Sequence, residues 1–310
     1  MKKIINPIST SILEKEINKD TFVRKTNYCD HDIYIVDYHN HPNATMEIGR
    51  LRELSFRNAG GGTGKSYDLD EFDTREEAFY KQLIVWEPEE KKIIGGYRFM
   101  LGNDVINSSK YNNTATNNLF DFSSDFYSNT LGLTIELGRS FVQPEYQPSS
   151  GNRKAIFSLD NLWDGLGALV VDHPEIKYFF GKVTMYLDFN KKGRDLILGF
   201  MDHFFKDKDQ WISAKQPLEL HHDIGYFIEQ IQELDYKESY KILTKKLKEL
   251  NCSLPPLIAA YMNLSSSMKT FGTAMNSKFG DVEETGILIS IDDIYPEKKD
   301  RHVNTYKKVK

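Results

Sequence analysis

The chain has 310 residues, 40% of them hydrophobic and 27% charged, and its formal net charge is −5. This is ordinary globular composition with enough length for a sizeable core, and its net charge does not point to nucleic acid as a partner. The two cysteines, Cys29 and Cys252, are too few and too far apart for a disulfide framework or a zinc site, which favours a reducing compartment and a protein without a metal.

The N-terminus is basic but lacks a long apolar core, so it does not have the form of a signal peptide. No apolar run approaches the roughly 20 residues that a membrane-spanning helix needs. The sequence therefore predicts a cytoplasmic protein. Residues 1–30 are polar with short helical stretches, and we expect them to form an N-terminal arm.

The following stretch predicts one helix and several antiparallel strands. Residues 32–38 alternate apolar and polar side chains as a strand does, and residues 46–56 have mostly helical apolar spacing. Two runs at 82–86 and 93–101 flank a turn and predict a hairpin. Residues 102–130 are rich in Asn, Ser and Thr, and we expect a long surface excursion there.

The second half of the chain alternates strands with helices. The pattern predicts strands at 133–142, 178–187 and 286–291, and helices at 157–171, 193–205, 224–250 (one helix or two) and 254–264. An antiparallel meander followed by strand–helix–strand–helix indicates an α+β fold with a mixed, mostly antiparallel sheet flanked by helices. We expect one domain over residues 31–295 with a helical insert at about 205–250, and a polar, frayed tail over residues 296–310.

Six charged residues lie within strand-like or helix-like apolar runs, where an unpaired charge is costly. Their signs alternate along the chain, which predicts that they meet and compensate one another in one site. The six are Arg52, Asp70, Asp73, Arg98, Glu136 and Arg139.

Residues 59–66 satisfy a loose P-loop pattern, with Ala59 in place of the first glycine. A phosphate-binding loop needs a buried strand before it and a helix after it. Here a helical segment precedes the loop, and the acidic residues 67–73 follow and would repel phosphate. We therefore interpret the segment as a flexible loop that closes over a substrate cleft.

Two further patterns are rejected. His221, His222 and Asp223 are adjacent, but no second cluster of ligands accompanies them, so a metal site is not favoured. His173 follows Asp172, but the Gly-x-Ser-x-Gly elbow of a serine hydrolase does not occur.

Three motifs taken together carry a family resemblance: residues 136–142 (ELGRSFV), 161–166 (NLWDGL) and 178–183 (YFFGKV). They resemble the amino-acid lipid N-acyltransferases, which are the ornithine and glycine lipid synthases, also labelled hemolysin-like. The resemblance extends upstream to Arg52, resumes at 254–261 and 279–281, and covers roughly residues 45–295 apart from the insert. It implies a GCN5-related acyltransferase fold over the main domain.

The six charged residues are also similar to those of acyl-homoserine lactone synthases, which share the superfamily. In that family an Arg of the first helix, an Asp-x-x-Asp pair, a strand Arg and a Glu-x-x-Arg pair shape the site. This chain is longer than those synthases, and residues 147–153 replace a shorter basic stretch after the Glu136 strand.

The resemblance implies that a thioester donates its acyl group to an amine. The amine must lose a proton before it attacks, and Glu136 is our candidate base. The alternative is a structural ion pair of Glu136 with Arg139 or Arg98. Three residues along a regular strand would put Glu136 and Arg139 on opposite faces, unless the strand is bulged as it commonly is in the superfamily.

The other charged residues are candidates for binding the acceptor. Asp70 and Asp73 would position its ammonium, or would instead hold Arg52 and Arg98. The two arginines would bind the acceptor carboxylate through bidentate hydrogen bonds, and this role is compatible with pairing to the aspartates.

The donor is expected beside the strand that ends at Val142. The amides of Phe141 and Val142 would polarise the thioester carbonyl, and the phosphate would meet a helix N-terminus near Arg153 and Lys154. Leu162, Trp163 and Leu166 are candidates for lining an acyl tunnel, although Trp163 fits the core better. No cofactor is expected. The donor is the phosphopantetheine thioester of acyl carrier protein, or acyl-CoA.

The resemblance therefore predicts an N-acyltransferase. We expect it to move a fatty acyl chain, which is 3-hydroxylated, to the α-amino group of glycine or ornithine. The lyso-lipid product implies transient contact with the inner face of the membrane. The lysine-rich residues 237–248 form a solvated helix face, or contact acidic acyl carrier protein or anionic lipid. The rivals are an autoinducer-synthase-like acyltransferase and a non-catalytic acyl-binding module.

Overall fold

The computed structural model describes residues 1–308, and for Lys154 it describes the backbone alone. One eight-stranded sheet forms the centre, with the strand order β1-β2-β3-β4-β6-β7-β10-β9, and a two-stranded sheet joins β5 to β8. Within the large sheet β6 and β7 are parallel, while the other neighbours are antiparallel. The strands are β1 Phe22–Lys25, β2 Asp32–Val36, β3 Lys81–Glu87, β4 Lys92–Leu101, β5 Phe120–Phe122, β6 Thr134–Val142, β7 Tyr178–Met185, β8 Ile212–Ala214, β9 Lys269–Asn276 and β10 Val282–Ser290.

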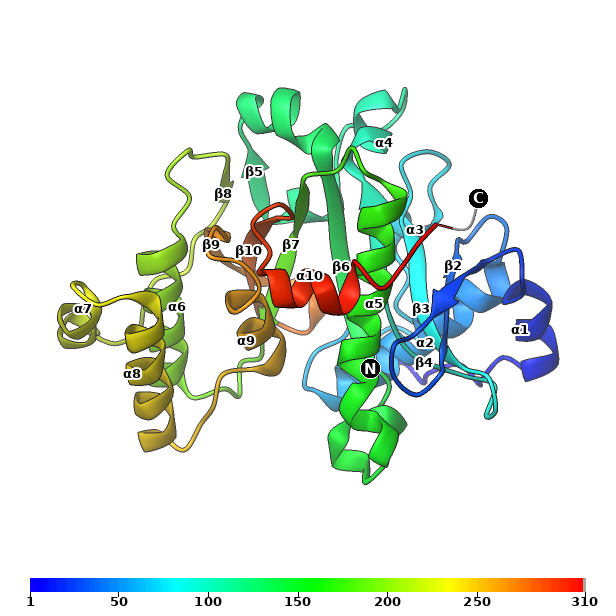
Figure 1. Cartoon of the computed structure of the whole chain (residues 1–310), viewed down its shortest axis with the longest axis horizontal. Coiled ribbons are helices and arrows are strands. Elements are labelled where there is room, and N and C mark those ends of the chain that lie inside the picture. The colour runs from blue at the N-terminus through cyan, green and yellow to red at the C-terminus, as the bar shows by residue number, and fades with distance from the viewer. Residues whose placement is uncertain (309–310) are drawn as a thin grey trace.

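Helices cover both faces of the sheet (Figure 1). They are α1 Thr10–Glu16, α2 Pro42–Asn58, α3 Glu71–Thr74, α4 Gly102–Asn107, α5 Ser158–Asp172, α6 Lys191–Phe205, α7 Gly225–Ile231, α8 Tyr236–Glu249, α9 Pro256–Met262 and α10 Pro296–His302. Because strand side chains alternate, Leu83 faces the core that contains α5, and its neighbour Ile84 faces the core that contains α1 and α2. We call these the α5 face and the α2 face of the sheet.

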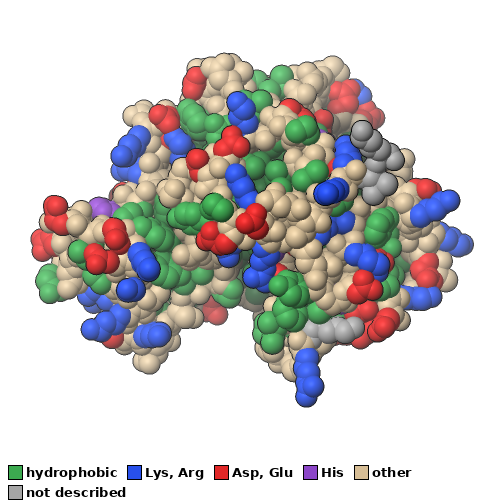
Figure 2. Space-filling view, in the orientation of Figure 1, with side chains coloured by type: hydrophobic (Ala, Val, Ile, Leu, Met, Phe, Trp, Pro, Cys, Tyr) green, Lys and Arg blue, Asp and Glu red, His purple; other side chains and the backbone are tan. Residues whose placement is uncertain are grey.

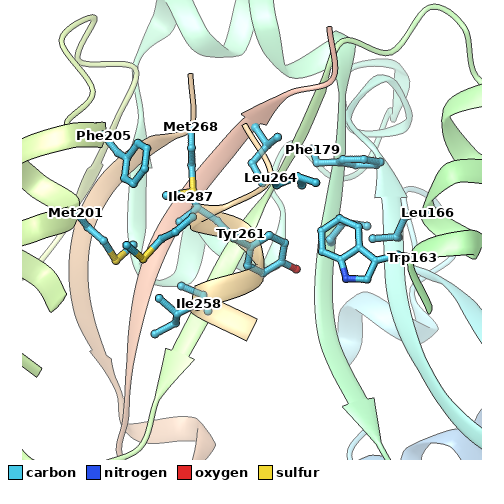
Figure 3. Packing of buried hydrophobic residues seen from close by; sticks show 14 of the residues in the cluster. Trp163, Leu166, Phe179, Met201, Phe205, Ile258, Tyr261, Leu264, Met268 and Ile287 are labelled. Carbon is cyan, nitrogen blue, oxygen red and sulfur yellow. The ribbon is translucent and has the colours of Figure 1, made fainter. Parts of the chain in front are cut away.

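On the α5 face, α9 lies between α5 and α6 and fills the space above the sheet. Figure 3 shows Tyr261 of α9 directed toward Trp163 of α5, and Met201 of α6 near Ile258 of α9. The rings of Tyr261 and Trp163 are 5.7 Å apart in an edge-on arrangement. This cluster joins the helices of the second half of the chain to the sheet.

The sheet opens at its centre, between β6 and β7. The two parallel strands pair from Thr134 opposite Tyr178 to Leu137 opposite Gly181. Beyond this point β6 continues to Val142 and β7 to Met185 without pairing with each other. The strands thus enclose a wedge-shaped opening, and residues from both of its sides are available to a ligand.

The predicted strands and helices from residue 32 onward are largely confirmed, and the charged segment 224–250 forms two helices, α7 and α8. Four strands were not predicted: β1 and β9, which are the outermost strands of the large sheet, and β5 and β8, which form the small sheet. Residues 102–130 are not a plain surface excursion, because β5 pairs with β8 and Phe120 and Phe126 are fully buried.

The predicted frayed tail is wrong for residues 296–302, which form α10. Here α10 packs on α5, and a side chain at Gly167 would collide with the carbonyl of His302. The ring of His302 also hydrogen-bonds to the carboxylate of Asp164, with 2.8 Å between the atoms. In the described part of the chain no helix is long and apolar enough to cross a bilayer.

Candidate active site

Three arginines and three aspartates form a buried cluster beside β4 and β6. Each arginine lies within 3.0 Å of one aspartate oxygen: Arg52 pairs with Asp68, Arg98 with Asp70, and Arg139 with Asp68. Asp73 joins Arg52 to Arg98 at 3.5 and 3.1 Å. The prediction that alternating charges meet is confirmed for these groups, and the cluster is balanced in charge. Asp68 is a member that the sequence did not reveal.

Local structure fixes the aspartates. Asp70 caps the short helix α3 and accepts from the amide of Phe72, while the carboxylate of Asp73 accepts from the amide of Asp70. This reciprocal capping box holds both carboxylates toward Arg98. Asp70 and Asp73 therefore both cap the helix and hold the arginines, rather than forming a solvated turn.

Burial alone would raise the pKa of Asp68, but Arg139 and Arg52 outweigh it and hold that pKa below its ordinary value. Burial opposes ionisation of Asp70 in the same way, and Arg98 and Arg139 nevertheless lower its pKa. Burial would lower the pKa of Arg98, yet Asp70 and Asp73 raise it well above its usual range. All three groups are consequently charged at neutral pH.

Glu136 does not form the ion pair with Arg139 or Arg98 that was one of our two interpretations. Its Oε1 accepts three hydrogen bonds: from the hydroxyl of Tyr80 at 2.6 Å, and from the hydroxyl and amide of Thr116 at 2.7 and 3.1 Å. Its Oε2 is buried and has no hydrogen-bond partner among the described residues. Tyr80 in turn stacks under the guanidinium of Arg98, with 4.4 Å from Cζ to the ring centroid.

The bulge expected in the Glu136 strand is present. Opposite β4, the register shifts between Gly96 and Arg98, so that Arg139 and Ser140 of β6 face Tyr97 alone. Arg139 has a φ of 50°, a left-handed conformation that is unusual for a residue with a side chain. The bulge turns Arg139 toward the α2 face, where its guanidinium lies 4.0 Å from the ring centroid of Phe279.

A cavity of about 460 Å³ passes through the wedge between β6 and β7. On the α5 face its wall is apolar, with Leu137, Phe179, Met185, Leu254, Leu257, Tyr261, Ile287 and Ile289. On the α2 face the polar and charged side chains Tyr80, Arg98, Glu136, Arg139, Lys182, Thr184 and Glu284 line the cavity, together with Phe56, Ala115, Phe180, Tyr186 and Phe279. A molecule in this cavity therefore meets an apolar surface on one side of the sheet and fixed charges on the other.

The two arginines predicted to bind the acceptor differ in their position relative to the cavity. Arg98 lines the cavity. Arg52 is only 1% exposed and does not line it, because its guanidinium is enclosed by Asp68, Asp73 and Gln82. Arg52 therefore holds the aspartates of the cluster and does not reach the cavity.

Three predicted donor residues, Phe141, Val142 and Arg153, do not line the cavity. Phe141 packs in the core of the α2 face, and the carbonyl of Val142 accepts from Gln147. Gly138, Arg139 and Ser140, slightly earlier in β6, line the cavity. Arg153 is exposed in a turn before α5, and the side chain of Lys154 lies outside the described part of the chain. Leu162, Trp163 and Leu166 are core residues of α5, as expected for Trp163.

The glycine-rich loop is pinned rather than free to close. The amides of Thr63 and Gly64 donate to the buried carboxylate of Glu53 at 2.9 and 2.8 Å, and the amide of Lys2 donates to the carbonyl of Gly64. Amides that would face phosphate in a P-loop are thus used within the protein. In the insert, the ring and amide of His222 hydrogen-bond to Asp195.

Proteins with assigned names resemble this chain over almost its full length. A glycine N(alpha)-acyltransferase of Bacteroides thetaiotaomicron is 49% identical over 307 residues, which cover 99% of this chain and 91% of that protein. A glycine N(alpha)-acyltransferase of Phocaeicola vulgatus is 48% identical over 309 residues, which cover 99% of this chain and 94% of that protein. The chain belongs to this acyltransferase family.

A family model and two solved structures are also similar to parts of this acyltransferase. The acetyltransferase (GNAT) domain family matches residues 51–155, which confirms the expected fold for the segment that holds the charge cluster and Glu136. Two structures of the CoA-dependent acyl-homoserine lactone synthase BjaI, one with MTA and one with SAM and isopentyl-CoA, are 10% identical to this chain and cover 89% of it and 89% of their own length. Their TM-scores are 0.39 and 0.40.

Several residues of the acyltransferase site were missed by the sequence. Tyr80 and Thr116 hold Glu136, and Lys182 and Glu284 line the cavity as a pair 3.6 Å apart. Lys182 lay inside a quoted family motif, and this was the one signal available for it. Thr116 had no such signal, because it comes from a polar segment and reaches Glu136 only through tertiary folding.

Proposed function

We propose that this acyltransferase moves a long acyl chain from a thioester to the α-amino group of glycine and so forms an N-acylglycine. The observation that carries the proposal is the cavity, which has an apolar wall on one side of the sheet and the unpartnered oxygen of Glu136 in its charged wall on the other. The choice of glycine is supported by the two relatives that match 99% of the chain.

The acyl chain belongs on the α5 face. There the cavity wall is formed by β7, β10 and the segment 253–261, and its side chains are aliphatic or aromatic. Transfer of methylene groups from water to such a wall is favourable by about 0.8 kcal/mol per group. An acyl chain of many carbons would therefore bind here, while the acceptor occupies the charged side.

Glu136 acts as the base in this proposal. Glycine arrives with a protonated amine, and Oε2 of Glu136 accepts one of its protons. The neutral nitrogen then attacks the thioester carbon, so that the C–N bond forms and the C–S bond breaks. The nitrogen loses its second proton to the departing thiolate, which leaves as a thiol, and Glu136 releases the first proton to solvent.

The bulge of β6 would bind the thioester carbonyl. Gly138, Arg139 and Ser140 line the cavity, and across the wedge β7 does not pair with this part of β6. Backbone donors fixed in this position stabilise the oxyanion that develops during attack. This assignment moves the carbonyl site upstream of Phe141 and Val142.

For the donor we propose the phosphopantetheine thioester of acyl carrier protein, with acyl-CoA as the alternative. Lys237, Lys241, Lys245 and Lys248 lie on one exposed face of α8, and among the described residues none of them forms an ion pair. Figure 2 shows Lys and Arg side chains gathered over the lower part of α8. Just after α8, the carbonyl of Leu250 accepts a hydrogen bond from the side chain of Asn190, which precedes α6. The neighbouring residues Asp188, Phe189 and Ser253 line the cavity. An acidic carrier would meet these lysines close to the cavity.

The test is product analysis with purified protein. A 3-hydroxyacyl thioester of acyl carrier protein and the same acyl-CoA are each offered with glycine, alanine, serine, ornithine and S-adenosylmethionine, and products are identified by mass spectrometry. We expect N-acylglycine, with acyl carrier protein as the better donor. Preference for ornithine would change the acceptor, and a lactone from S-adenosylmethionine would favour the autoinducer-like rival. No product from any pair would favour the non-catalytic binding module.

The same comparison in living cells tests the pathway role. Cells that express the protein should accumulate N-acylglycine, the first intermediate of an amino-acid lipid, and cells that express Glu136→Gln should not. Such an amphiphilic product would leave toward the inner face of the membrane. Equal lipid profiles in both cultures, with soluble protein in each, would contradict the proposal.

A further inference from the structure

Lys182 is a cation of the cavity that has no hydrogen-bond acceptor among the described residues. Its side chain is 13% exposed and lines the charged wall. Its one ion-pair partner among the described residues is Glu284, and the distance from Nζ to Oε2 is 3.6 Å, beyond hydrogen-bond range. The same Oε2 accepts from the amide group of Asn276 at 3.1 Å, so Glu284 is already engaged.

Arg98 and Arg139, the other cations of the cavity wall, each have a carboxylate oxygen at 2.9 Å, although the Nε atom of each lacks a hydrogen-bond partner among the described residues. Arg98 donates to Asp70 at 2.9 Å and to Asp73 at 3.1 Å, and Arg139 lies 2.9 Å from Asp68. A largely buried ammonium with unfilled donors is costly unless an anion completes it. Lys182 is therefore the cation in the cavity wall whose carboxylate partner lies farthest away.

Lys182 lies on the same side of the sheet as Glu136. Glu136 is directly opposite Phe180 in the parallel pairing of β6 and β7, and Lys182 is two residues further along β7. Alternation puts Phe180 and Lys182 on one face, separated by about 7 Å of strand. Because pairing ends at Gly181, Lys182 is the first residue of β7 inside the wedge.

We infer that Lys182 binds the α-carboxylate of the acceptor amino acid and so places its amino group at Oε2 of Glu136. This inference rests on the proposed function, because it assigns one end of the proposed acceptor. The phosphate of a carrier is a less suitable ligand, since the whole pantetheine arm separates it from the thioester, whereas Lys182 lies near the base. The Lys182–Glu284 pair is then an acceptor subsite, in which Glu284 limits the net positive charge.

The experiment compares glycine with glycinamide, which has the amine but lacks the carboxylate. Values of kcat/KM for both acceptors are measured for the native protein, Lys182→Met, Lys182→Arg and Glu284→Gln, with one acyl thioester as donor. Since each acceptor is compared with itself across variants, the different basicity of the two amines cancels. Melting curves and the KM of the donor show whether each variant is folded and binds the thioester.

For Lys182→Met we expect a loss of about 10- to 100-fold in kcat/KM for glycine, the usual size for one charge-assisted hydrogen bond, carried mainly by KM. Glycinamide turnover should be largely unchanged, and Lys182→Arg should recover part of the glycine activity. Glu284→Gln should act in the opposite direction and lower the KM for glycine, because the competing charge is gone. This second variant keeps the inference testable if Lys182→Met does not fold.

Equal losses with glycine and glycinamide would overturn the inference and indicate a structural role for Lys182. A raised KM for the donor with an unchanged KM for glycine would also overturn it, in favour of a phosphate contact. Failure of the proposed function can be distinguished from failure of this inference. In the first case the native protein itself forms no N-acylglycine.

Discussion

The hydroxyl of Tyr80 donates a 2.6 Å hydrogen bond to Oε1 of Glu136. Burial raises the pKa of Tyr80 well above its usual value, and the neighbouring Glu136 raises it further, so the hydroxyl keeps its proton and remains a donor. The same hydroxyl accepts from the amide of Ala115 at 3.2 Å, which fixes its direction. One oxygen of Glu136 is thus held by the protein, while the other has no hydrogen-bond partner among the described residues.

Glu136→Gln should abolish most turnover. The amide cannot accept the ammonium proton, and loss of a general base typically costs about 10²- to 10⁴-fold in rate. We expect the fall in kcat, with the KM values for donor and acceptor little changed because the shape is conserved. Steady-state kinetics of N-acylglycine formation measure both. Retention of native kcat would exclude Glu136 as the base.

Tyr80→Phe and Thr116→Val test whether orientation of Glu136 matters. Each variant removes one hydroxyl donor to Oε1 and leaves the amide of Thr116 in place. We expect about a 10-fold lower kcat for either change, the effect of losing a hydrogen bond worth roughly 1.5 kcal/mol. The control variant is Thr244→Val, at an exposed hydroxyl on α8. Gln82→Glu would not be a suitable control, because Gln82 contacts Asp73. Unchanged kcat in both site variants would show that the hydroxyls do not position the base.

Asp68→Asn should strongly destabilise the fold. Asp68 is fully buried and serves both Arg52 and Arg139, and removing one partner of such a pair typically costs about 3–5 kcal/mol. Urea unfolding measures the loss. Glu145→Gln, which breaks the exposed pair with Lys92, is the matched control and should change nothing measurable. Equal unfolding midpoints for Asp68→Asn and the native protein would contradict the account of the cluster.

The same carboxylates give the stability a defined pH dependence. The pKa values of Asp68 and Asp70 are lowered in the folded state, because the arginines outweigh burial. Their contribution is full above the unfolded pKa of about 3.9 and is lost as pH falls below it toward the folded values. Melting temperatures between pH 7 and pH 3 should therefore drop in the acid range, and less steeply for a folded Asp70→Asn variant. Parallel curves for the two proteins would contradict this assignment.

Charge reversal on α8 tests the carrier surface. The double variant Lys245→Glu, Lys248→Glu should raise the KM for acyl carrier protein thioester about 10-fold or more and leave the KM for acyl-CoA unchanged, since the small donor needs no docking surface. The effect should shrink at high salt. Lys208→Glu, at an exposed position beyond the other end of α6, is the control. Equal changes with both donors would remove α8 from the docking surface.

The central strands and α5 could be predicted from the sequence because burial makes their patterns strong. In the large sheet the strands that escaped prediction, β1 and β9, are the two outermost, and their exposed positions include apolar residues, Phe22 in β1 and Met275 in β9, which blurs the alternation. In β9 the pattern is also interrupted by Gly272, which has a φ of 82° and lies where the register with β10 shifts. Their place in the sheet is decided by pairing with β2 and β10, and such pairing leaves little trace in a single sequence.

For the site, charge within apolar runs correctly pointed to a compensated cluster. It did not separate the supporting Arg52 from Arg98, because both occur in similar local patterns and differ only in how the tertiary structure encloses them. The flexible loop predicted at residues 59–66 differs from the structure for a related reason: glycine content suggested freedom, but Glu53 supplies a buried acceptor for the amides of Thr63 and Gly64. Contacts formed only in the folded protein decide the roles of such residues, and the contact of Thr116 with Glu136 is another example.

The cavity walls on the two faces of the sheet share strands but not side chains. β6, β7 and β10 line both walls with side chains on opposite faces, whereas segment 253–261 lines the apolar wall and Arg98 of β4 lines the charged wall. Substitutions at sites that do not touch one another usually have additive effects. Substitutions in α9 can therefore change the preferred acyl-chain length while the preferred acceptor stays the same. The specificity of this enzyme for one substrate can be engineered without changing the residues that bind the other.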